Sequence, residues 1–287
     1  MTTNRLVGID LGATNTLVGV VEGDAVTERH HRATPSHLGF EGVVAATCEM
    51  VSEVAPDAGA VGIAVAGSVD VESGVVLRAQ NLDWTNAPLA SAMWDRLGKP
   101  VIIENDVTAA AWGEHRLGAG KEHPSLFAAW VGTGIGGGLV LDGRPWRGPL
   151  GTAGEIGMSV SEPEGESGRR VVEDFASRCG LRRVLGEPCG TEEIAAAFDR
   201  GDEQVMLGMR RLGTALANVV SLLAVDLIVL GGGIVEATGE PLLRVIREQF
   251  DRDVFPPDSR RCRLALTELG PNAGILGAAD LAAPLTM

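Results

Sequence analysis

The feature that constrains this chain most is a pattern that occurs twice: an apolar run, a glycine-rich turn and a second apolar run. In the first half, Leu6–Asp10 and Thr16–Val21 flank such a turn. In the second half, Leu126–Val131 and Leu139–Asp142 flank the turn Gly132–Gly138. Runs of this kind predict strands joined by tight turns. Two hairpins can be alike by chance, but the β-then-α order within each half favours a duplicated α/β unit.

The remaining apolar periodicity predicts alternating strands and helices. Further strands are predicted over Ala25–Arg29, Val61–Ala66, Pro100–Glu104, Leu227–Leu230 and Arg263–Thr267. Helices are predicted over Phe40–Val54, Val107–Leu117, Val171–Leu185, Thr191–Asp199, Glu203–Val225, Glu240–Phe250 and Gly274–Leu281. We therefore expect two α/β domains, residues 1–117 and 118–287, with both turns facing one cleft. Whether the last helix, near residues 274–283, packs back on the first domain stays open.

The charge balance narrows the possible partners. The formal net charge is −14, and such an acidic surface repels nucleic acid and anionic membranes. Lysine occurs only at Lys99 and Lys121, and the G-x-x-x-x-G-K-[ST] phosphate motif is absent. A phosphate ligand would therefore need local donors or a metal ion. We expect no nucleic-acid and no membrane partner.

The four cysteines indicate a cytoplasmic protein. They form no C-x-x-C pair, so we interpret them as reduced thiols rather than as a disulfide framework or a zinc site. A polar start that leads directly into a strand indicates no signal peptide. The longest apolar tract, 217–235, is interrupted by polar residues and is typical of a helix that runs into a buried strand.

The two glycine turns suggest phosphate binding. Gly132-x-Gly134-x-x-Gly137 matches the dinucleotide fingerprint, but a strand and not a helix is expected after it. A hairpin whose amides meet a phosphate tail fits better, with the Thr133 hydroxyl as a further donor. In Asp10-x-Gly12-x-Thr14, amides and a hydroxyl can hold phosphate, while Asp10 can hold hydrated Mg²⁺. The alternative is an ordinary hairpin turn capped by an aspartate.

Other carboxylates suggest polyol chemistry. Glu104-Asn105-Asp106 lies where a strand meets a helix, and an Asn-Asp pair can grip vicinal hydroxyls and take a proton from another. The competing role of Asp106 is that of a helix N-cap. Glu155 and Glu173 can accept hydrogen bonds from hydroxyl groups, or they can simply lie on a solvated face.

Taken together, these segments resemble the ROK family (repressor, open reading frame, kinase) of sugar kinases, within the actin-like ATPase superfamily. The resemblance covers nearly the whole chain and rests on Gly8–Thr14, Ala66–Asp70, Asn81–Trp84, Glu104–Glu114, Gly132–Gly138 and Leu230–Gly233. It implies two actin-like (ribonuclease H-like) α/β domains, the smaller N-terminal one on the sugar side and the larger C-terminal one on the nucleotide side.

The resemblance also implies a role for individual residues. Asp106 would be the general base, and the sugar ligands would be Gly67, Asn105, Asp106, Glu155, Met158 and Glu173. The nucleotide would be bound by Asp10, Gly12, Ala13, Thr14, Asn15, Gly132, Thr133, Gly134, Gly231, Gly232 and Gly233, with Asp10 holding Mg²⁺ through water. The implied reaction transfers the γ-phosphoryl group of ATP to the primary hydroxyl of a hexose, in a cytoplasmic homodimer.

The sequence departs from the family at two motifs. The family's E-x-G-H reads Glu155-Ile156-Gly157-Met158 here, and its cysteine cluster is replaced by Glu164–Glu173. We therefore expect no zinc. Because zinc normally braces the sugar ligands, this loss opens the choice of acceptor. Glucose is the default; an amino sugar such as kanosamine, or a C7 cyclitol, is the alternative, since an amino group would offset two crowded carboxylates. A sugar sensor without catalysis is the alternative of another class.

Overall fold

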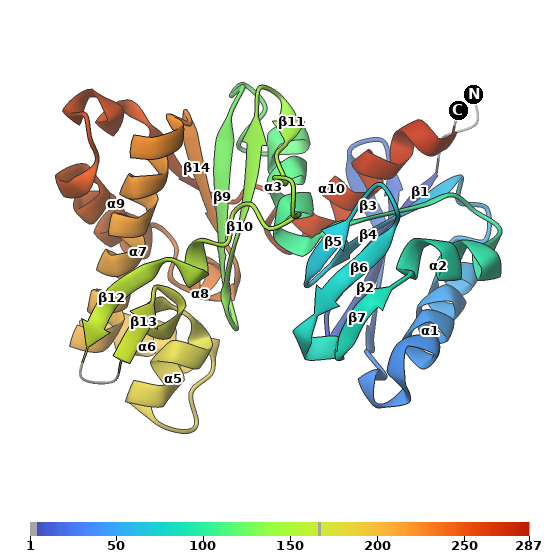
Figure 1. Cartoon of the computed structure of the whole chain (residues 1–287), viewed down its shortest axis with the longest axis horizontal. Coiled ribbons are helices and arrows are strands. Elements are labelled where there is room, and N and C mark those ends of the chain that lie inside the picture. The colour runs from blue at the N-terminus through green and yellow to red at the C-terminus, as the bar shows by residue number, and fades with distance from the viewer. Residues whose placement is uncertain (1–4, 166–167, 287) are drawn as a thin grey trace. The chain divides into compact units, whose positions relative to one another are not determined.

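Residues 5–165 and 168–286 are described by the structure, a computed structural model, in which the chain forms two units (Figure 1). Unit 1 holds the chain up to Leu117, the short segment Arg147–Thr152 and the chain from Pro271 onward. Unit 2 holds Gly118–Trp146 and Ala153–Gly270. Unit 1 is thus assembled from three separate stretches of sequence.

The sheet of unit 1 has five strands in the order β3-β2-β1-β4-β8. They are β1 (Leu6–Leu11), β2 (Asn15–Glu22), β3 (Ala25–Ala33), β4 (Ala60–Val65) and β8 (Val101–Asn105). The three strands of the first hairpins pair antiparallel, whereas β1, β4 and β8 run parallel. Strands β1 and β4 are buried almost throughout, which explains their nearly continuous apolar sequence.

The sheet of unit 2 repeats this topology, in the order β11-β10-β9-β14-β15. Its strands are β9 (Leu126–Val131), β10 (Ile135–Leu141), β11 (Arg144–Pro145), β14 (Leu227–Gly231) and β15 (Arg263–Leu266). Again the hairpin strands are antiparallel and the other pairs are parallel. The duplication expected from the sequence is therefore confirmed, and both units are α/β, as predicted.

In the described part of unit 1 there are four α-helices: α1 (Gly39–Val54), α2 (Leu89–Leu97), α3 (Asp106–Leu117) and α10 (Ala273–Ala282). Helix α10 lies directly on the backbone of β1 and β4. A Cβ at Gly8 would lie 2.0 Å from the carbonyl oxygen of Ile275, and one at Gly62 would lie 1.8 Å from that of Ala278. Only glycine permits so close an approach, so these residues fix where the helix sits on the sheet.

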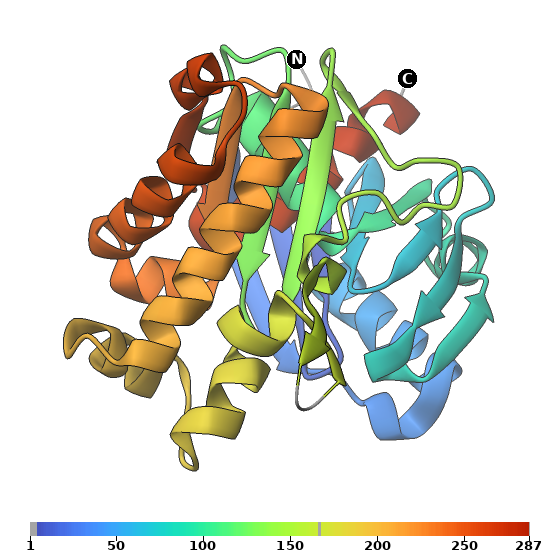
Figure 2. The ribbon, with the colours of Figure 1, turned by 60° about the vertical axis from the view of Figure 1, so that its left-hand side comes forward.

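Unit 2 carries the other helices. They are α4 (Glu173–Ala176), α5 (Arg178–Leu185), α6 (Thr191–Asp199), α7 (Glu203–Leu223), α8 (Gly233–Thr238) and α9 (Glu240–Asp253). Helix α7 lies across the sheet (Figure 2). It begins at the N-cap Asp202, whose carboxylate accepts hydrogen bonds from the Gln204 and Val205 amides.

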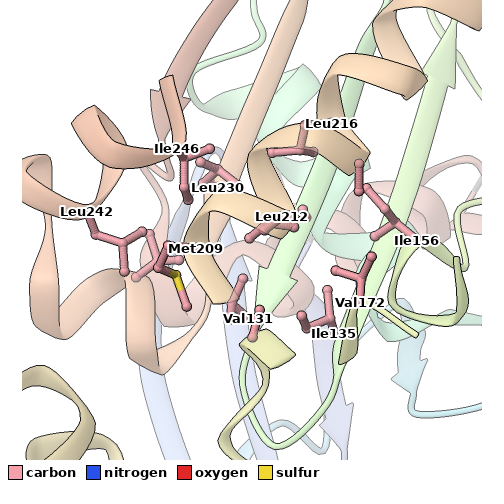
Figure 3. Close-up of a cluster of buried hydrophobic side chains, with 14 of the residues drawn as sticks. Val131, Ile135, Ile156, Val172, Met209, Leu212, Leu216, Leu230, Leu242 and Ile246 are labelled. Carbon is pink, nitrogen blue, oxygen red and sulfur yellow. The ribbon is translucent and has the colours of Figure 1, made fainter. Parts of the chain in front are cut away.

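The core of unit 2 lies between this sheet and its helices. Met209, Leu212 and Leu216 form a stripe at helical spacing along α7 and are fully buried. Figure 3 shows them with Val131 and Ile135, the two residues that flank the second glycine turn. The turn is therefore anchored at both ends in a packed apolar cluster.

The elements differ from the sequence expectation at several places. Gly136–Gly138 lie inside β10 and not in a turn. A side chain at Gly137 would collide with the carbonyl of Gly154 at 2.2 Å, so this strand position requires glycine for packing and not for a turn. The expected helix 171–185 is broken at Ser177 into α4 and α5. The sequence analysis missed the helices α2 and α8 and several short strands: β5 (Ser68–Asp70), β6 (Val75–Ala79), β7 (Trp84–Ala87), β11, β12 (Val160–Gly165) and β13 (Gly168–Val171).

No helix in the described ranges combines the length and the apolar character that crossing a membrane requires.

Candidate active site

The first glycine turn, between β1 and β2, is held by Thr34. The Gly12 N–H donates to the carbonyl of Asn15 at 3.0 Å and closes the turn. The Thr34 hydroxyl donates to the Gly12 carbonyl at 2.7 Å, and the Thr34 N–H donates to the Thr14 carbonyl at 2.9 Å. A trans peptide places its C=O and N–H on opposite sides, so the Ala13 N–H, in the same peptide plane as the Gly12 carbonyl, points away from Thr34. The sequence analysis did not identify Thr34.

Asp10 lies one residue before the end of β1, beside this turn. Burial raises the pKa of its carboxyl group, and the positive charge of Arg29 opposes this shift. A single carboxylate next to a set of backbone amides is a donor set that fits a hydrated Mg²⁺ bound to phosphate, because Mg²⁺ keeps several waters and takes few carboxylates.

The second glycine turn, between β9 and β10, is held by the first residues of α5. The Arg178 N–H donates to the Gly132 carbonyl at 2.9 Å, and the Cys179 N–H donates to the Thr133 carbonyl at 3.2 Å. The N–H groups of Thr133 and Gly134 belong to the same two peptide planes and therefore point away from α5. Two neighbouring amides with a shared direction form a concavity that suits an anion.

The structure tests one of the two roles weighed for Asp106, that of the helix N-cap. Helix α3 begins at Asp106, and the side-chain oxygen of Asn105 accepts the N–H of Thr108 at 2.9 Å. Asn105, not Asp106, therefore caps the helix, and the N-cap interpretation of Asp106 is wrong. The Asn105 amide donates to the Gly67 carbonyl at 3.1 Å and to Asp106 Oδ1 at 2.9 Å, so it fixes the orientation of the Asp106 carboxylate.

Glu104 precedes this pair and is almost completely buried. Two N–H groups of Arg147 donate to Glu104 Oε2, with Nε at 2.7 Å and Nη2 at 2.5 Å, while Oε1 accepts the Asn105 N–H at 2.9 Å. Burial raises the pKa of Glu104, and Arg147 opposes this shift. The ion pair ties the segment 147–152 to the strand end that carries Asn105 and Asp106. Sequence reasoning missed Arg147, because no local pattern links positions 43 residues apart.

Glu155 and Glu173 lie close together in unit 2. Glu173 Oε2 accepts the N–H of Ile135 at 2.7 Å, directly after the second turn. Burial raises the pKa of Glu155, and the negative charge of Glu173 raises it further. Met158 ends the short 3-10 helix Ile156–Met158 and is 48% exposed. The structure thus brings these three predicted sugar ligands to the same side of unit 2 as the second turn.

The predicted adenosine motif ends β14 and begins α8. Gly231 is the last residue of β14, and a side chain there would meet the ring of Trp130 at 2.7 Å. Gly232 has φ +91° and precedes Gly233, the first residue of α8. A side chain at Gly232 would collide with the backbone of Val131, which leads into the second turn. The motif therefore packs against the strand that carries the second phosphate turn.

A metal cluster is not seen among the residues that the structure describes: no three His, Cys, Asp or Glu side chains lie close enough to share an ion.

Comparison with known proteins identifies the family of this chain. The family model described as "ROK family" matches residues 6–284. The chain belongs to the ROK family. It is 34% identical over 307 residues to a glucokinase of Thermotoga maritima, a match that covers 96% of each protein. It is 32% identical to a glucokinase of Streptomyces coelicolor, again over 96% of each.

Solved structures of the family agree with this assignment. A ROK glucokinase from Streptomyces griseus, solved in complex with glucose and AMPPNP, superimposes with a TM-score of 0.84 at 34% identity. That match covers 98% of this chain and 99% of the glucokinase. A ROK hexokinase from Thermus thermophilus also gives a TM-score of 0.84, at 31% identity and with 98% of each chain covered. The resemblance inferred from the sequence is confirmed.

Proposed function

We propose that this ROK protein is an ATP-dependent sugar kinase that transfers the γ-phosphoryl group to the primary 6-hydroxyl of a hexose. The observation that carries the proposal is the Asn105–Asp106 arrangement, in which the asparagine caps α3 and orients the aspartate. The similarity to glucokinases over nearly the whole chain supports the same reaction class.

In the proposed mechanism, Asp106 accepts the proton of the acceptor hydroxyl. The freed oxygen forms a bond to the γ-phosphorus of ATP, while the bond from that phosphorus to the β-γ bridging oxygen breaks and ADP leaves. The hydrogen bond from the Asn105 amide keeps the Asp106 carboxylate in one orientation before the acceptor arrives. A positioned base of this kind supplies about 10²–10⁴ of the rate.

The two glycine turns are proposed to bind the phosphate groups of ATP. Their carbonyl groups are already bonded, by Thr34 in unit 1 and by α5 in unit 2, so their amides are oriented before the ligand binds. Asp10 would hold the nucleotide's Mg²⁺ through water. When bound, this ion neutralises phosphate charge. Gly231–Gly233 would receive the adenosine.

The pair Glu155 and Glu173 favours a second acceptor class, the amino hexoses. Burial and the negative charge of Glu173 both raise the pKa of Glu155, so a negative charge on Glu155 is costly here. A protonated amino group placed between them would remove this cost, whereas the hydroxyl of a neutral hexose would not. Met158 stands where the family has its histidine, and a methionine cannot carry the competing positive charge that a histidine can.

A screen of ATP-dependent ADP release would test the proposal. The acceptors would be glucose, mannose, glucosamine, kanosamine, N-acetylmannosamine and C7 cyclitols, each assayed with the wild type and with Asp106→Asn. We expect one acceptor to stimulate release, and the variant to lose roughly 10²–10⁴ of kcat while it still binds AMPPNP. If no acceptor raises ADP release above the variant's level, the kinase proposal fails and the alternative, a sugar sensor without catalysis, is favoured. Retained turnover in Asp106→Asn would remove Asp106 from the mechanism.

The same assay separates the two acceptor classes. Glu155→Gln removes one negative charge without changing the size of the side chain. If the acceptor carries an ammonium group, kcat/KM for glucosamine or kanosamine should fall more than kcat/KM for glucose. Equal losses for charged and neutral sugars would contradict an amino-sugar preference.

A further inference from the structure

Lysine is scarce in this chain, although its proposed nucleotide carries several negative charges. The net charge is −14 and only two lysines are present. One of them, Lys99, donates to the carbonyl groups of Pro56 and Ala58, both at 2.8 Å. The other 22 of the 24 basic residues are arginines, so an arginine near one of the two turns is the expected side-chain cation for the phosphate tail.

Arg178 is bound to the second turn through both its backbone and its side chain. It is the first residue of α5, directly after the buried N-cap Ser177. Its N–H donates to the Gly132 carbonyl, and its guanidinium Nη2 donates to the Thr133 hydroxyl. The guanidinium group is thereby held beside Thr133, whose backbone N–H points away from α5.

The neighbouring arginines of α5 are engaged differently. Arg182 pairs with Glu187, and Arg183 pairs with Asp174. Arg178, in contrast, forms no ion pair with any carboxylate of the described residues, and its partner is the neutral hydroxyl of Thr133. It is partly exposed. A guanidinium has five donors, so most of them remain available for an anion.

We propose that Arg178 binds the phosphate tail of the nucleotide together with the amides of Thr133 and Gly134. The inference rests on the proposed nucleotide-dependent phosphotransfer. Guanidinium and phosphate match in geometry and charge, and Arg binds such groups with two parallel hydrogen bonds. The Thr133 hydroxyl holds the guanidinium in place until the phosphate arrives.

Binding of Mg²⁺·AMPPNP, measured by calorimetry, would test this role. Arg178→Ala should weaken binding by roughly tenfold, and Arg178→Lys by less, because lysine keeps the charge but loses the fork. Arg182→Ala is the matched control, since it removes an arginine from the same helix that pairs with Glu187; its affinity should stay within about twofold of the wild type.

Adenosine is the second probe, because it lacks phosphate. Its affinity should be the same in Arg178→Ala and in the wild type. Higher salt should also weaken AMPPNP binding more in the wild type than in Arg178→Ala, since the variant has lost a screened attraction.

Two results would overturn the inference. AMPPNP binding by Arg178→Ala that equals the wild type would show that Arg178 does not touch phosphate. An equal loss of AMPPNP and adenosine affinity would show that Arg178 only shapes the turn. Failure of the proposed function would look different, because the wild type itself would then bind no AMPPNP.

Discussion

Asp10 of unit 1 and Trp130 of unit 2 occupy the same place in the two repeated sheets. Each is the residue before the last in the strand that leads into a glycine turn. Asp10 is paired in register with Ala64 of β4, and Trp130 is paired with Gly231 of β14. Unit 1 therefore places a carboxylate where unit 2 places an indole ring against a glycine. The repeated topology preserves the position, but not the chemistry, of this residue.

The two glycine turns also differ, in length and in the residues that hold them. Between the paired residues Leu11 and Thr16 the first turn has four residues, 12–15, whereas between Val131 and Ile135 the second has three, 132–134. The first turn is braced by the uncharged Thr34, and the second by the backbone and the guanidinium of Arg178. Unit 1 thus has a carboxylate beside its turn, which suits a metal ion, whereas unit 2 has a positively charged guanidinium group, which suits phosphate itself.

The largest expected effect on stability concerns the ion pair of Glu104 and Arg147 in unit 1. Arg147→Met would leave Glu104 buried without its partner, and we expect the free energy of unfolding to fall by roughly 2–3 kcal/mol, less than for a fully buried pair because Arg147 is partly exposed. Chemical denaturation measures this. The double variant Glu104→Gln, Arg147→Met should recover much of the loss. A single variant as stable as the wild type would show that the pair contributes nothing to the fold.

Alanine substitutions in the turns should give intermediate and graded effects. A Cβ at Gly134 would lie 2.5 Å from Glu173 Oε2 and would push this carboxylate off the Ile135 amide, at a cost of about 1–3 kcal/mol. At Gly12 it would lie 3.1 Å from the Asn15 carbonyl, which needs a shift of only a few tenths of an ångström. At Gly132 it would meet nothing within 4 Å. The loss of melting temperature should therefore be largest for Gly134→Ala, smaller for Gly12→Ala and smallest for Gly132→Ala. A larger loss at Gly132 than at Gly134 would contradict the contacts described.

The smallest expected effect is the pH dependence of Asp10. Because burial raises the pKa of this carboxyl, the folded chain holds the proton more tightly than the unfolded chain, whose value is near 3.8. The charged group therefore opposes folding at neutral pH, and its contribution becomes more favourable as the pH falls through the folded pKa. Asp10→Asn should raise Tm at pH 7 by a few degrees, on the order of 1 kcal/mol, while it weakens Mg²⁺-dependent nucleotide binding. An unchanged or lower Tm at pH 7 would mean that Asp10 is stabilised by its surroundings.

The sequence allowed much of the fold to be predicted, because buried strands and amphipathic helices repeat with fixed periods. The hairpins around Gly12 and Gly132–Gly134 follow from apolar runs that flank small residues. The short strands β5–β7 did not follow, since three to five residues give too little periodicity. Strands β12 and β13 are rich in charged residues, and long-range contacts hold them: Arg211 of α7 binds Ser161 and Glu162.

The candidate site was predicted less completely, for a related reason. Asn105 and Asp106 were singled out as neighbours, but either of two adjacent polar residues can cap a helix, and only the hydrogen bond to Thr108 distinguishes them. Thr34, Arg147 and Arg178 act through contacts with residues far away in sequence. No local pattern in the sequence marks such contacts.

The close fit of α10 on Gly8 and Gly62 has a consequence for how the protein is made. Strands β1 and β4 leave the ribosome early, but the helix that covers their glycines is translated only after the whole of unit 2. During synthesis, unit 2 can reach its final packing while unit 1 still exposes a bare strip of backbone. The half of the molecule that is translated first is thus the half that is finished last.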